Sequence, residues 1–378
     1  MQQEYLGFES INNLKEILSK HNPKNIFLVT GKSSYEKCGA KKAIEPYLEN
    51  CNVINFYDFE VNPKLKDIEK GIEVFKKNNC DFVIAVGGGS VMDVAKSINV
   101  LAANDEKPQE YVDKKINIEN RGKTLVAIPT TSGSGSEATR FAVIYINKIK
   151  CSLDHEFVVP DYAIVDPHFT MNLPKEITAS AGMDALCQAI ESYWCINSTD
   201  KSKNYAKEAI KLAMSNLSDA VNNPSEQSRE AMSKAAHLAG KAINISKTTS
   251  CHAVSYPITS YFNVLHGHAV ALTLGQMLVY NSSVTKNDLS DKRGVDYVKT
   301  TIDEIVNLIG AWNAEEASEK ISNLMEEIGL STKLSRLGIR TNNDINIIIK
   351  NGFDPDRVKN NPRKLTEEAL REILSNIR

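Results

Sequence analysis

Short apolar, β-rich runs alternate with helical stretches through the first half of this 378-residue chain. Such alternation is typical of a parallel sheet covered by helices. Between the second and third runs, apolar residues from Pro63 to Asn78 recur near the 3.6-residue period of an amphipathic helix, which completes a βαβ unit. The five runs expected as strands are Asn25–Thr30, Val53–Tyr57, Phe82–Val86, Thr124–Ile128 and Tyr162–Val165.

The pattern changes near Pro174, where strand-like runs almost vanish and helical periodicity continues to the end. We therefore expect an α/β domain over residues 1–172 and an all-helical domain over residues 173–378. The helices expected in the second domain are Ile177–Trp194, Lys203–Ala220, Ser225–Ile245, Ala269–Tyr280, Tyr297–Gly310, Ala314–Gly329 and Thr366–Ile377.

Composition excludes several classes of protein. With 45 basic and 47 acidic side chains, the net charge of −2 argues against a general polyanion-binding surface, so no nucleic-acid partner is expected. No apolar run is long enough to span a membrane, and no basic segment followed by an apolar run begins the chain, so we expect a cytoplasmic protein. The seven cysteines are scattered without a C-x-x-C pair and are interpreted as reduced thiols.

A glycine-rich segment, Gly87-Gly88-Gly89-Ser90, directly follows the third strand-like run and precedes a helical stretch. Residues without a Cβ let a ligand approach the backbone, and the amides at a helix N-terminus attract a phosphate. A pyrophosphate site and an ordinary tight turn both fit this segment.

A second loop over residues 129–139 is rich in hydroxyls and follows the fourth run, where open α/β sheets bind ligands. A flexible linker is the alternative interpretation of that loop.

The turn after the first run, Gly31-Lys32-Ser33-Ser34, contains no acidic residue. A carboxylate at such a turn commonly selects NAD by repelling the 2′-phosphate of NADP. NADP is therefore admissible and slightly preferred here. An ordinary turn without ligand contact is the alternative.

Possible metal ligands gather in the helical half of the chain. Asp184 and Gln188 are four residues apart and share a helix face, and His252, His266 and His268 fall within 17 residues. A carboxylate with imidazoles suits Fe²⁺ or Zn²⁺, whereas Gln188 offers only a neutral oxygen. Capped or solvent-facing histidines are the alternative, because no contiguous ligand signature is present.

Four of these segments, in this order, resemble motifs of the iron-containing, or group III, alcohol dehydrogenases: GGGSVMDVAK (87–96), PTTSGSGSEAT (129–139), GMDALCQAIESYW (182–194) and HAVSYP with HGHA (252–269). The resemblance implies a dehydroquinate synthase-like fold, in which a Rossmann-like dinucleotide-binding domain precedes an all-helical metal- and substrate-binding domain. It also implies an NAD(P)-dependent oxidoreductase with small aldehyde or alcohol substrates, and a homodimer.

Carried over by motif, the resemblance implies that NAD(P)H contacts Gly88, Gly89, Ser90, Asp93, Thr130, Thr131, Ser134, Asn62, Pro63 and Lys150. It places the metal at Asp184, His252 and His266. Gln188 stands where the family usually has histidine, so it coordinates through its oxygen, water completes the shell, or the metal is weak or absent. Tyr256 stands where many members have a histidine in the proton relay.

The segment around residues 239–250, with Tyr256 and the HGH sequence, looks more like the branch acting on small anionic aldehydes, such as phosphonoacetaldehyde and sulfoacetaldehyde reductases and a similar sugar-acid dehydrogenase. Surface charge is the alternative role for its cations. The residues that can bind the anionic group are Arg140, Asn244, Lys247, Thr248 and Thr249.

We therefore expect metal-assisted hydride transfer to a carbonyl carbon. His268 is the expected proton donor and Tyr256 positions the substrate, because the reference pKa of histidine is about 6.5 and that of tyrosine about 10. Two alternatives remain: a lyase or cyclase resembling 3-dehydroquinate synthase with transient NAD use, and a catalytically silent anion-binding protein.

Overall fold

The computed structural model describes residues 2–146, 149–353 and 355–378, which form two units, Met1–Leu173 and Pro174–Arg378. In the first unit, the described strands form a parallel six-stranded sheet in the order β1-β8-β5-β4-β2-β3 and an antiparallel pair, β6 and β7. The strands are β1 (Gln3–Leu6), β2 (Asn25–Thr30), β3 (Asn52–Phe56), β4 (Phe82–Gly87), β5 (Thr124–Pro129), β6 (Phe141–Ile146), β7 (Ile149–Asp154) and β8 (Tyr162–Val165).

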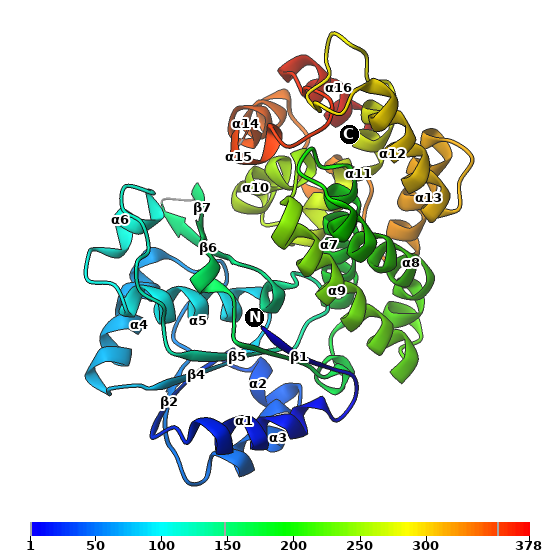
Figure 1. Ribbon diagram of the computed structural model, residues 1–378. Coiled ribbons are helices and arrows are strands. Elements are labelled where there is room, and N and C mark those ends of the chain that lie inside the picture. The colour runs from blue at the N-terminus through cyan, green and yellow to red at the C-terminus, as the bar shows by residue number, and fades with distance from the viewer. Residues whose placement is uncertain (1, 147–148, 354) are drawn as a thin grey trace. The chain divides into compact units, whose positions relative to one another are not determined.

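Helices cover both faces of this sheet (Figure 1). Side chains alternate between the faces, so Phe27 and Ala85 pack toward α4 and α5, whereas Leu28 and Ile84 pack toward α1 and α3. The helices of this unit are α1 (Asn13–His21), α2 (Ser34–Lys37), α3 (Ala40–Leu48), α4 (Leu65–Lys77), α5 (Gly89–Ala102) and α6 (Pro108–Val112), with 3₁₀ turns η1 (Ser10–Asn12), η2 (Ser136–Ala138), η3 (Glu156–Val158) and η4 (Pro167–Thr170).

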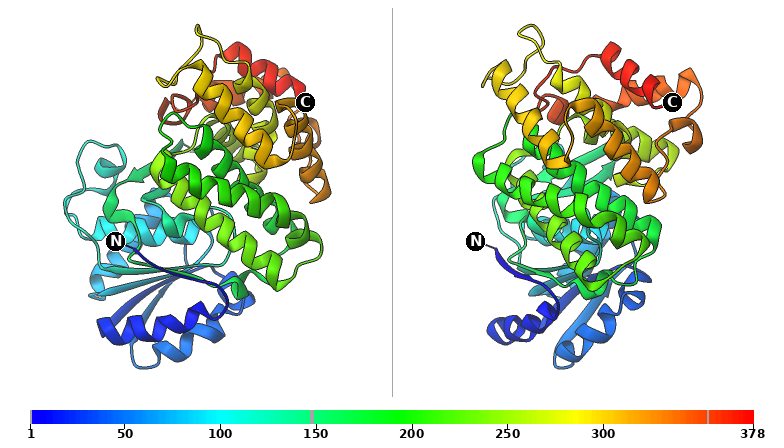
Figure 2. Two further views of the ribbon diagram at one scale, coloured as in Figure 1. Left: turned by 45° about the vertical axis from the view of Figure 1, so that its right-hand side comes forward. Right: turned by 90° about the vertical axis from the view of Figure 1, so that its right-hand side faces the viewer.

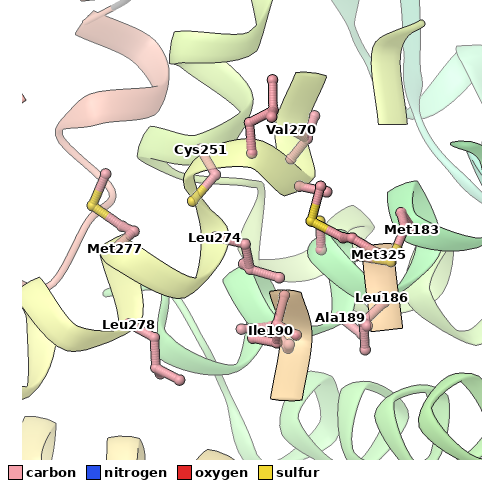
Figure 3. Packing of buried hydrophobic residues seen from close by; sticks show 14 of the residues in the cluster. Met183, Leu186, Ala189, Ile190, Cys251, Val270, Leu274, Met277, Leu278 and Met325 are labelled. Atoms are coloured by element: carbon pink, nitrogen blue, oxygen red, sulfur yellow. The ribbon is translucent and has the colours of Figure 1, made fainter. Parts of the chain in front are cut away.

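The second unit is built of helices, and Figure 2 shows it from two further sides. They are α7 (Lys175–Trp194), α8 (Asp200–Asn222), α9 (Glu226–Ser246), α10 (Ser250–Phe262), α11 (His266–Ser282), α12 (Val295–Ile309), α13 (Ala314–Glu327), α14 (Asn342–Gly352), α15 (Pro355–Val358) and α16 (Glu367–Asn376), with the 3₁₀ turn η5 (Leu334–Leu337). Buried side chains of α7 and α11 pack together at its centre, as Figure 3 shows for Ile190 and Leu274.

The predicted fold class is confirmed: an α/β unit with a parallel sheet precedes a helical unit. The sequence pattern did not predict β1, the pairing of β6 with β7, or helices α10 and α14. None of the described helices is long and apolar enough to cross a membrane.

Candidate active site

The glycine-rich segment lies where the parallel sheet changes the direction of its strand order. The chain passes from β2 outward to β3 and returns to β4 on the other side of β2, so β2 and β4 flank the switch point at which such sheets bind ligands. Helix α5 begins at Gly89, immediately after β4, with its N-terminal amides at that edge.

The hydroxyl-rich loop packs directly against the glycine-rich segment. The Thr130 amide donates to the Gly87 carbonyl over 3.0 Å. A Cβ on Gly88 would lie 3.3 Å from Thr131, and one on Gly89 would lie 3.1 Å from Ser134 Oγ. The absence of side chains therefore leaves room for the second loop and keeps the backbone accessible. The structure brings these residues together, as the sequence interpretation requires.

Buried Lys96 holds the second loop in place, a role that the sequence did not reveal. Its Nζ donates to oxygens on one side of the loop, Ser136 O (2.8 Å) and Oγ (3.2 Å), Thr139 Oγ1 (3.1 Å) and Phe141 O. Burial lowers the pKa of Lys96 to about 8, against the opposing effect of Asp93 and Glu137. Ser136 Oγ in turn donates to Asp93 Oδ1 over 3.0 Å, and burial raises the pKa of Asp93.

Asn62, Pro63 and Lys150 lie beside this group. The backbone amide of Asn62 donates to Ser90 Oγ over 3.3 Å. The Pro63 carbonyl accepts from the Tyr145 amide over 2.8 Å, and Lys150 is paired with Tyr145 across the β6–β7 ladder. The expected cofactor residues from these three segments thus occupy one edge of the first unit.

The turn Gly31–Ser34 follows β2 at the same edge, because it comes directly after the carboxyl end of that strand. A Cβ on Gly31 would lie 2.1 Å from Ser34 Oγ, so the turn is closely folded. An acidic residue, Asp58, lies after the neighbouring strand β3, where sequence reasoning did not look. A hydrogen bond from Lys70 and the nearby charge of Lys32 lower the pKa of Asp58.

Asp184, His252 and His266 meet in the second unit, although they come from three different helices. One ligand atom from each lies within 4.8 Å of the others. Asp184 Oδ1 and His252 Nε2 are 3.3 Å apart, close to the roughly 3.4 Å expected for two ligands about 2.1 Å from a tetrahedrally bound ion. A Cβ on Gly267 would lie 1.8 Å from the Ser180 carbonyl oxygen, so glycine lets α11 begin against α7.

Gln188 lies one helical turn after Asp184 and is buried. Its Oε1 has no hydrogen-bond partner among the described residues. A buried amide oxygen without a partner is costly, and a cation bound beside it would relieve that cost. The donor set therefore fits a divalent ion, with Gln188 as a weak oxygen ligand.

Glu191 contacts a proposed ligand, and sequence reasoning did not single it out, although it lies within a quoted motif. It is fully buried, and its Oε2 is hydrogen-bonded to Nδ1 of His252. Burial lowers the pKa of His252, but the carboxylates of Glu191 and Asp184 outweigh this effect and raise the pKa to about 9. The i, i+7 spacing of Asp184 and Glu191 signals a shared helix face, but it does not show that both carboxylates contact one histidine.

The structure does not bring His268 to the ligand group. Two residues apart on α11, His266 and His268 point about 200° away from each other. His268 Nε2 donates to the Ser331 carbonyl over 2.7 Å, and burial lowers the pKa of His268. The Nε2 proton of His268 is thus already donated to the Ser331 carbonyl. This arrangement lends no support to the predicted role of His268 as proton donor.

Tyr256 does reach the site, with its ring stacked on that of His266 at a centroid distance of 6.3 Å. Arg357 Nε donates to the Tyr256 hydroxyl over 3.3 Å. Arg357 is a cation that the sequence interpretation did not single out, because it lies about a hundred residues away in a segment without a motif.

The five residues expected to bind the anionic group of the substrate lie in both units and differ in burial and in hydrogen-bond partners. Arg140, in the first unit, pairs with Asp154 at 2.8 Å. Asn244 and Lys247 are half-buried near the end of α9, and Thr248 is buried. Lys247 has φ 71° and ψ 175°, a backbone conformation that strains any residue with a side chain. Thr249 is buried and its hydroxyl donates to Glu191 Oε1, so it supports His252 indirectly.

Two family models match the chain. The model for iron-containing alcohol dehydrogenase matches residues 2–167, and the model for the C-terminal part of the Fe-containing alcohol dehydrogenase family matches residues 178–378. The chain belongs to the iron-containing alcohol dehydrogenase family. Like the named members of that family, it is an oxidoreductase of the alcohol dehydrogenase and reductase class.

Several members of the family are similar over most of the chain. Phosphonoacetaldehyde reductase of Streptomyces viridochromogenes is 34% identical over 78% of this chain and 75% of its own length. NAD-dependent methanol dehydrogenase of Bacillus methanolicus is 30% identical over 86% of this chain and 84% of its own length. The crystal structure of sulfoacetaldehyde reductase from Bifidobacterium kashiwanohense in complex with NAD⁺ superposes with a TM-score of 0.89 and 29% identity, covering 100% of this chain and 96% of that one.

Proposed function

We propose that this enzyme reduces a small aldehyde that carries an anionic group, with NAD(P)H as the hydride donor. The observation that carries the proposal is the meeting of Asp184, His252 and His266 within 4.8 Å. These residues, with Gln188, would hold a divalent ion, which acts as a Lewis acid on a carbonyl oxygen when bound. We keep both Fe²⁺ and Zn²⁺ as candidates, because the donor set suits either.

Cofactor binding is proposed for the edge of the first unit. The backbone of Gly88 and Gly89 and the N-terminus of α5 would hold the pyrophosphate. Lys96 keeps the loop with Thr131 and Ser134 against that backbone through its contacts with Ser136 and Phe141. We propose that NADPH is accepted at least as well as NADH, since the turn at Gly31 carries no carboxylate.

Preference for an anionic substrate is supported by Arg357, a cation that reaches the ligand group through Tyr256, and by the strained backbone of Lys247 at the end of α9. Arg357 is joined to Tyr256, and Tyr256 is stacked on His266, so a guanidinium lies one side chain away from a proposed ligand. Lys247 keeps its side chain at a strained backbone position, where glycine would cost less. Tyr256 would position the substrate, and these two cations would bind its phosphonate or sulfonate. The similarity to phosphonoacetaldehyde and sulfoacetaldehyde reductases points the same way.

The test is consumption of NADPH and NADH, followed by absorbance, with phosphonoacetaldehyde, sulfoacetaldehyde and the uncharged methylsulfonylacetaldehyde. We expect kcat/KM to be highest for the charged aldehydes, and we expect Arg357→Met and Lys247→Met to remove that preference. Equal turnover of charged and uncharged aldehydes would contradict the anionic substrate class alone. No net consumption of either cofactor with any aldehyde would contradict the reductase and favour the lyase alternative.

A further inference from the structure

The hydrogen bonds behind His252 run from several donors toward Glu191. Trp194 Nε1, which can only donate, donates to Thr249 Oγ1 over 2.8 Å. The Thr249 hydroxyl therefore keeps its own proton for Glu191 Oε1, 2.6 Å away. The Cys251 amide, also only a donor, reaches the same Oε1 over 2.8 Å. Two donors thus converge on Oε1, as expected for an ionised carboxylate.

This direction continues to the ligand histidine. With Oε1 occupied by two donors, the remaining oxygen, Oε2, faces Nδ1 of His252. An ionised carboxylate can only accept, so Nδ1 carries a proton and donates it. In neutral imidazole the lone pair is then on Nε2, the atom that lies 3.3 Å from Asp184 Oδ1. Glu191 of α7 thus holds the ring at Nδ1 and leaves the Nε2 lone pair beside Asp184 Oδ1, where both atoms could bind an ion.

His266 has a weaker support of the same kind. Its Nδ1 lies 3.4 Å from Ser255 Oγ, and the Ser255 hydroxyl donates to the His252 carbonyl over 2.7 Å. Ser255 Oγ can therefore accept from His266 Nδ1, but it is neutral and farther away than the Glu191 carboxylate is from His252. A carboxylate behind a ligand histidine fixes the tautomer and raises the basicity of the ligand more than a hydroxyl does.

We propose that Glu191 is a positioning residue that fixes His252 with Nδ1 protonated, and that this carboxylate, rather than Ser255 behind His266, sets the metal affinity of the site. The inference rests on the metal site of the proposed function. A purely structural role is the competing explanation, since Glu191 also accepts from Cys251 at the N-terminus of α10. The two roles differ in their need for charge, because a neutral amide oxygen can still accept from a backbone amide.

The experiment measures Zn²⁺ affinity and the Zn²⁺ dissociation rate of the full-length protein after chelator treatment, by competition with a chromophoric chelator. Glu191→Gln keeps the shape and the acceptor of Glu191 and removes its charge. We expect its affinity to fall about 10–100-fold, the usual effect of losing such a partner, with faster dissociation and an unchanged circular dichroism spectrum. Thr249→Val removes one hydrogen bond to the carboxylate and should lower the affinity about fivefold.

Two variants serve as controls. Ser255→Ala should change the affinity less than threefold, the difference that the longer contact to His266 predicts. Glu304→Gln removes the charge of a carboxylate that accepts a hydrogen bond from Tyr193, a residue of α7 like Glu191, and should bind Zn²⁺ like the wild type.

The outcomes separate the two proposals. If the wild type binds Zn²⁺ and both Glu191→Gln and Thr249→Val bind it equally well, the inference about Glu191 fails and the metal site stands. A loss in Ser255→Ala as large as that in Glu191→Gln would also overturn it. If the wild type binds no Zn²⁺, the metal part of the proposed function fails, and the inference fails with it. Should Glu191→Gln not fold, the Thr249→Val result decides.

Discussion

Gln188 stands, as the motif resemblance implies, where the family usually has a histidine. An imidazole is a better ligand for Fe²⁺ or Zn²⁺ than a neutral amide oxygen. We expect Gln188→His to tighten Zn²⁺ binding by about 10–100-fold, a range typical of changes around one ligand. Activity need not rise, because a fourth strong protein ligand closes the position that a carbonyl oxygen requires.

Two quantities are measured on the same protein samples, the affinity for Zn²⁺ and the rate of aldehyde reduction. Gln188→Leu, which has similar volume and no oxygen, is the matched control and should bind no more tightly than the wild type. Equal affinity of Gln188→His and wild type would show that position 188 does not face the ion.

Gly31 governs the proposed cofactor preference. An aspartate at this turn would repel the 2′-phosphate of NADPH, so Gly31→Asp should shift the ratio of kcat/KM toward NADH by at least about tenfold. Gly31→Asn has the same shape without the charge. Both variants must displace Ser34 Oγ, which lies 2.1 Å from the added Cβ. A shift of the same size in Gly31→Asn would assign the effect to the turn and not to charge.

At the scale of single residues, the sequence predicted which side chains meet at the proposed metal site better than it predicted their surroundings. Asp184, His252 and His266 could be named from a family resemblance, and the structure brings them together. Glu191 could not be found, because its partners Thr249, Cys251 and His252 lie about sixty residues further along the chain. The predicted role of His268 gains no support from the structure, since the number of nearby histidines says nothing about the helix face on which each one lies.

Lys96 joins helix α5 to the loop after β5 through hydrogen bonds. Its pKa falls from the ordinary 10.5 to about 8 in the folded protein. Between these pH values the unfolded chain binds the proton more tightly, so Lys96 favours folding increasingly as the pH rises from about 8 to 10.5. That contribution is lost as the pH falls through 8.

Lys96→Met should remove this part of the pH dependence. We expect the free energy of unfolding, measured by urea titration, to be lower by about 1–3 kcal/mol, because acceptors such as Phe141 O lose a buried donor. Between pH 8 and 10.5, the free energy of unfolding of Lys96→Met should rise less with pH, or fall more steeply, than that of the wild type. Lys15→Met, at an exposed position, is the control. Parallel pH curves for Lys96→Met and wild type would contradict the lowered pKa.

Long helices and uniformly apolar strands were predicted, and several shorter elements were missed. The run Phe82–Val86 is apolar throughout and corresponds to strand β4, buried on both faces. Strand β1 has only four residues, two of them polar, and forms through parallel pairing with β8 at the far end of the first unit's sequence. Helix α10 contains Pro257, which normally argues against a helix interior, and packing against α11 and α14 overrides that preference.

The two units of the molecule are expected to respond separately to their ligands. A ligand stabilises the part of the fold that binds it, by about 2.7 kcal/mol at a hundred times its Kd. By hydrogen exchange, Zn²⁺ should protect amides in α7, α10 and α11. NADPH should protect the amides of residues 87–93 and 130–136 instead. Two outcomes would contradict this division of binding between the units. One is protection of the glycine-rich segment by Zn²⁺ alone, and the other is no protection of that segment by NADPH.

On the scale of the whole molecule, the order of an α/β unit followed by helices was readable from periodicity, because buried parallel strands are uniformly apolar. The packing of ten helices in the described second unit was not readable in this way. Amphipathic stripes show that helices are covered, but they do not show which helices become neighbours.

The helices that present the proposed ligands also form the apolar centre of the second unit. On α7, Leu186 and Ile190 face the core (Figure 3). Asp184 and Glu191 of the same helix face His252. Gly267 leaves no spare space between α11 and α7. Interiors are close-packed, so a change of one methylene in the core moves the helix that carries a ligand. Selection can thus adjust the spacing of the ligands through hydrophobic positions, and surveys of variants confined to the ligands themselves would overlook that route.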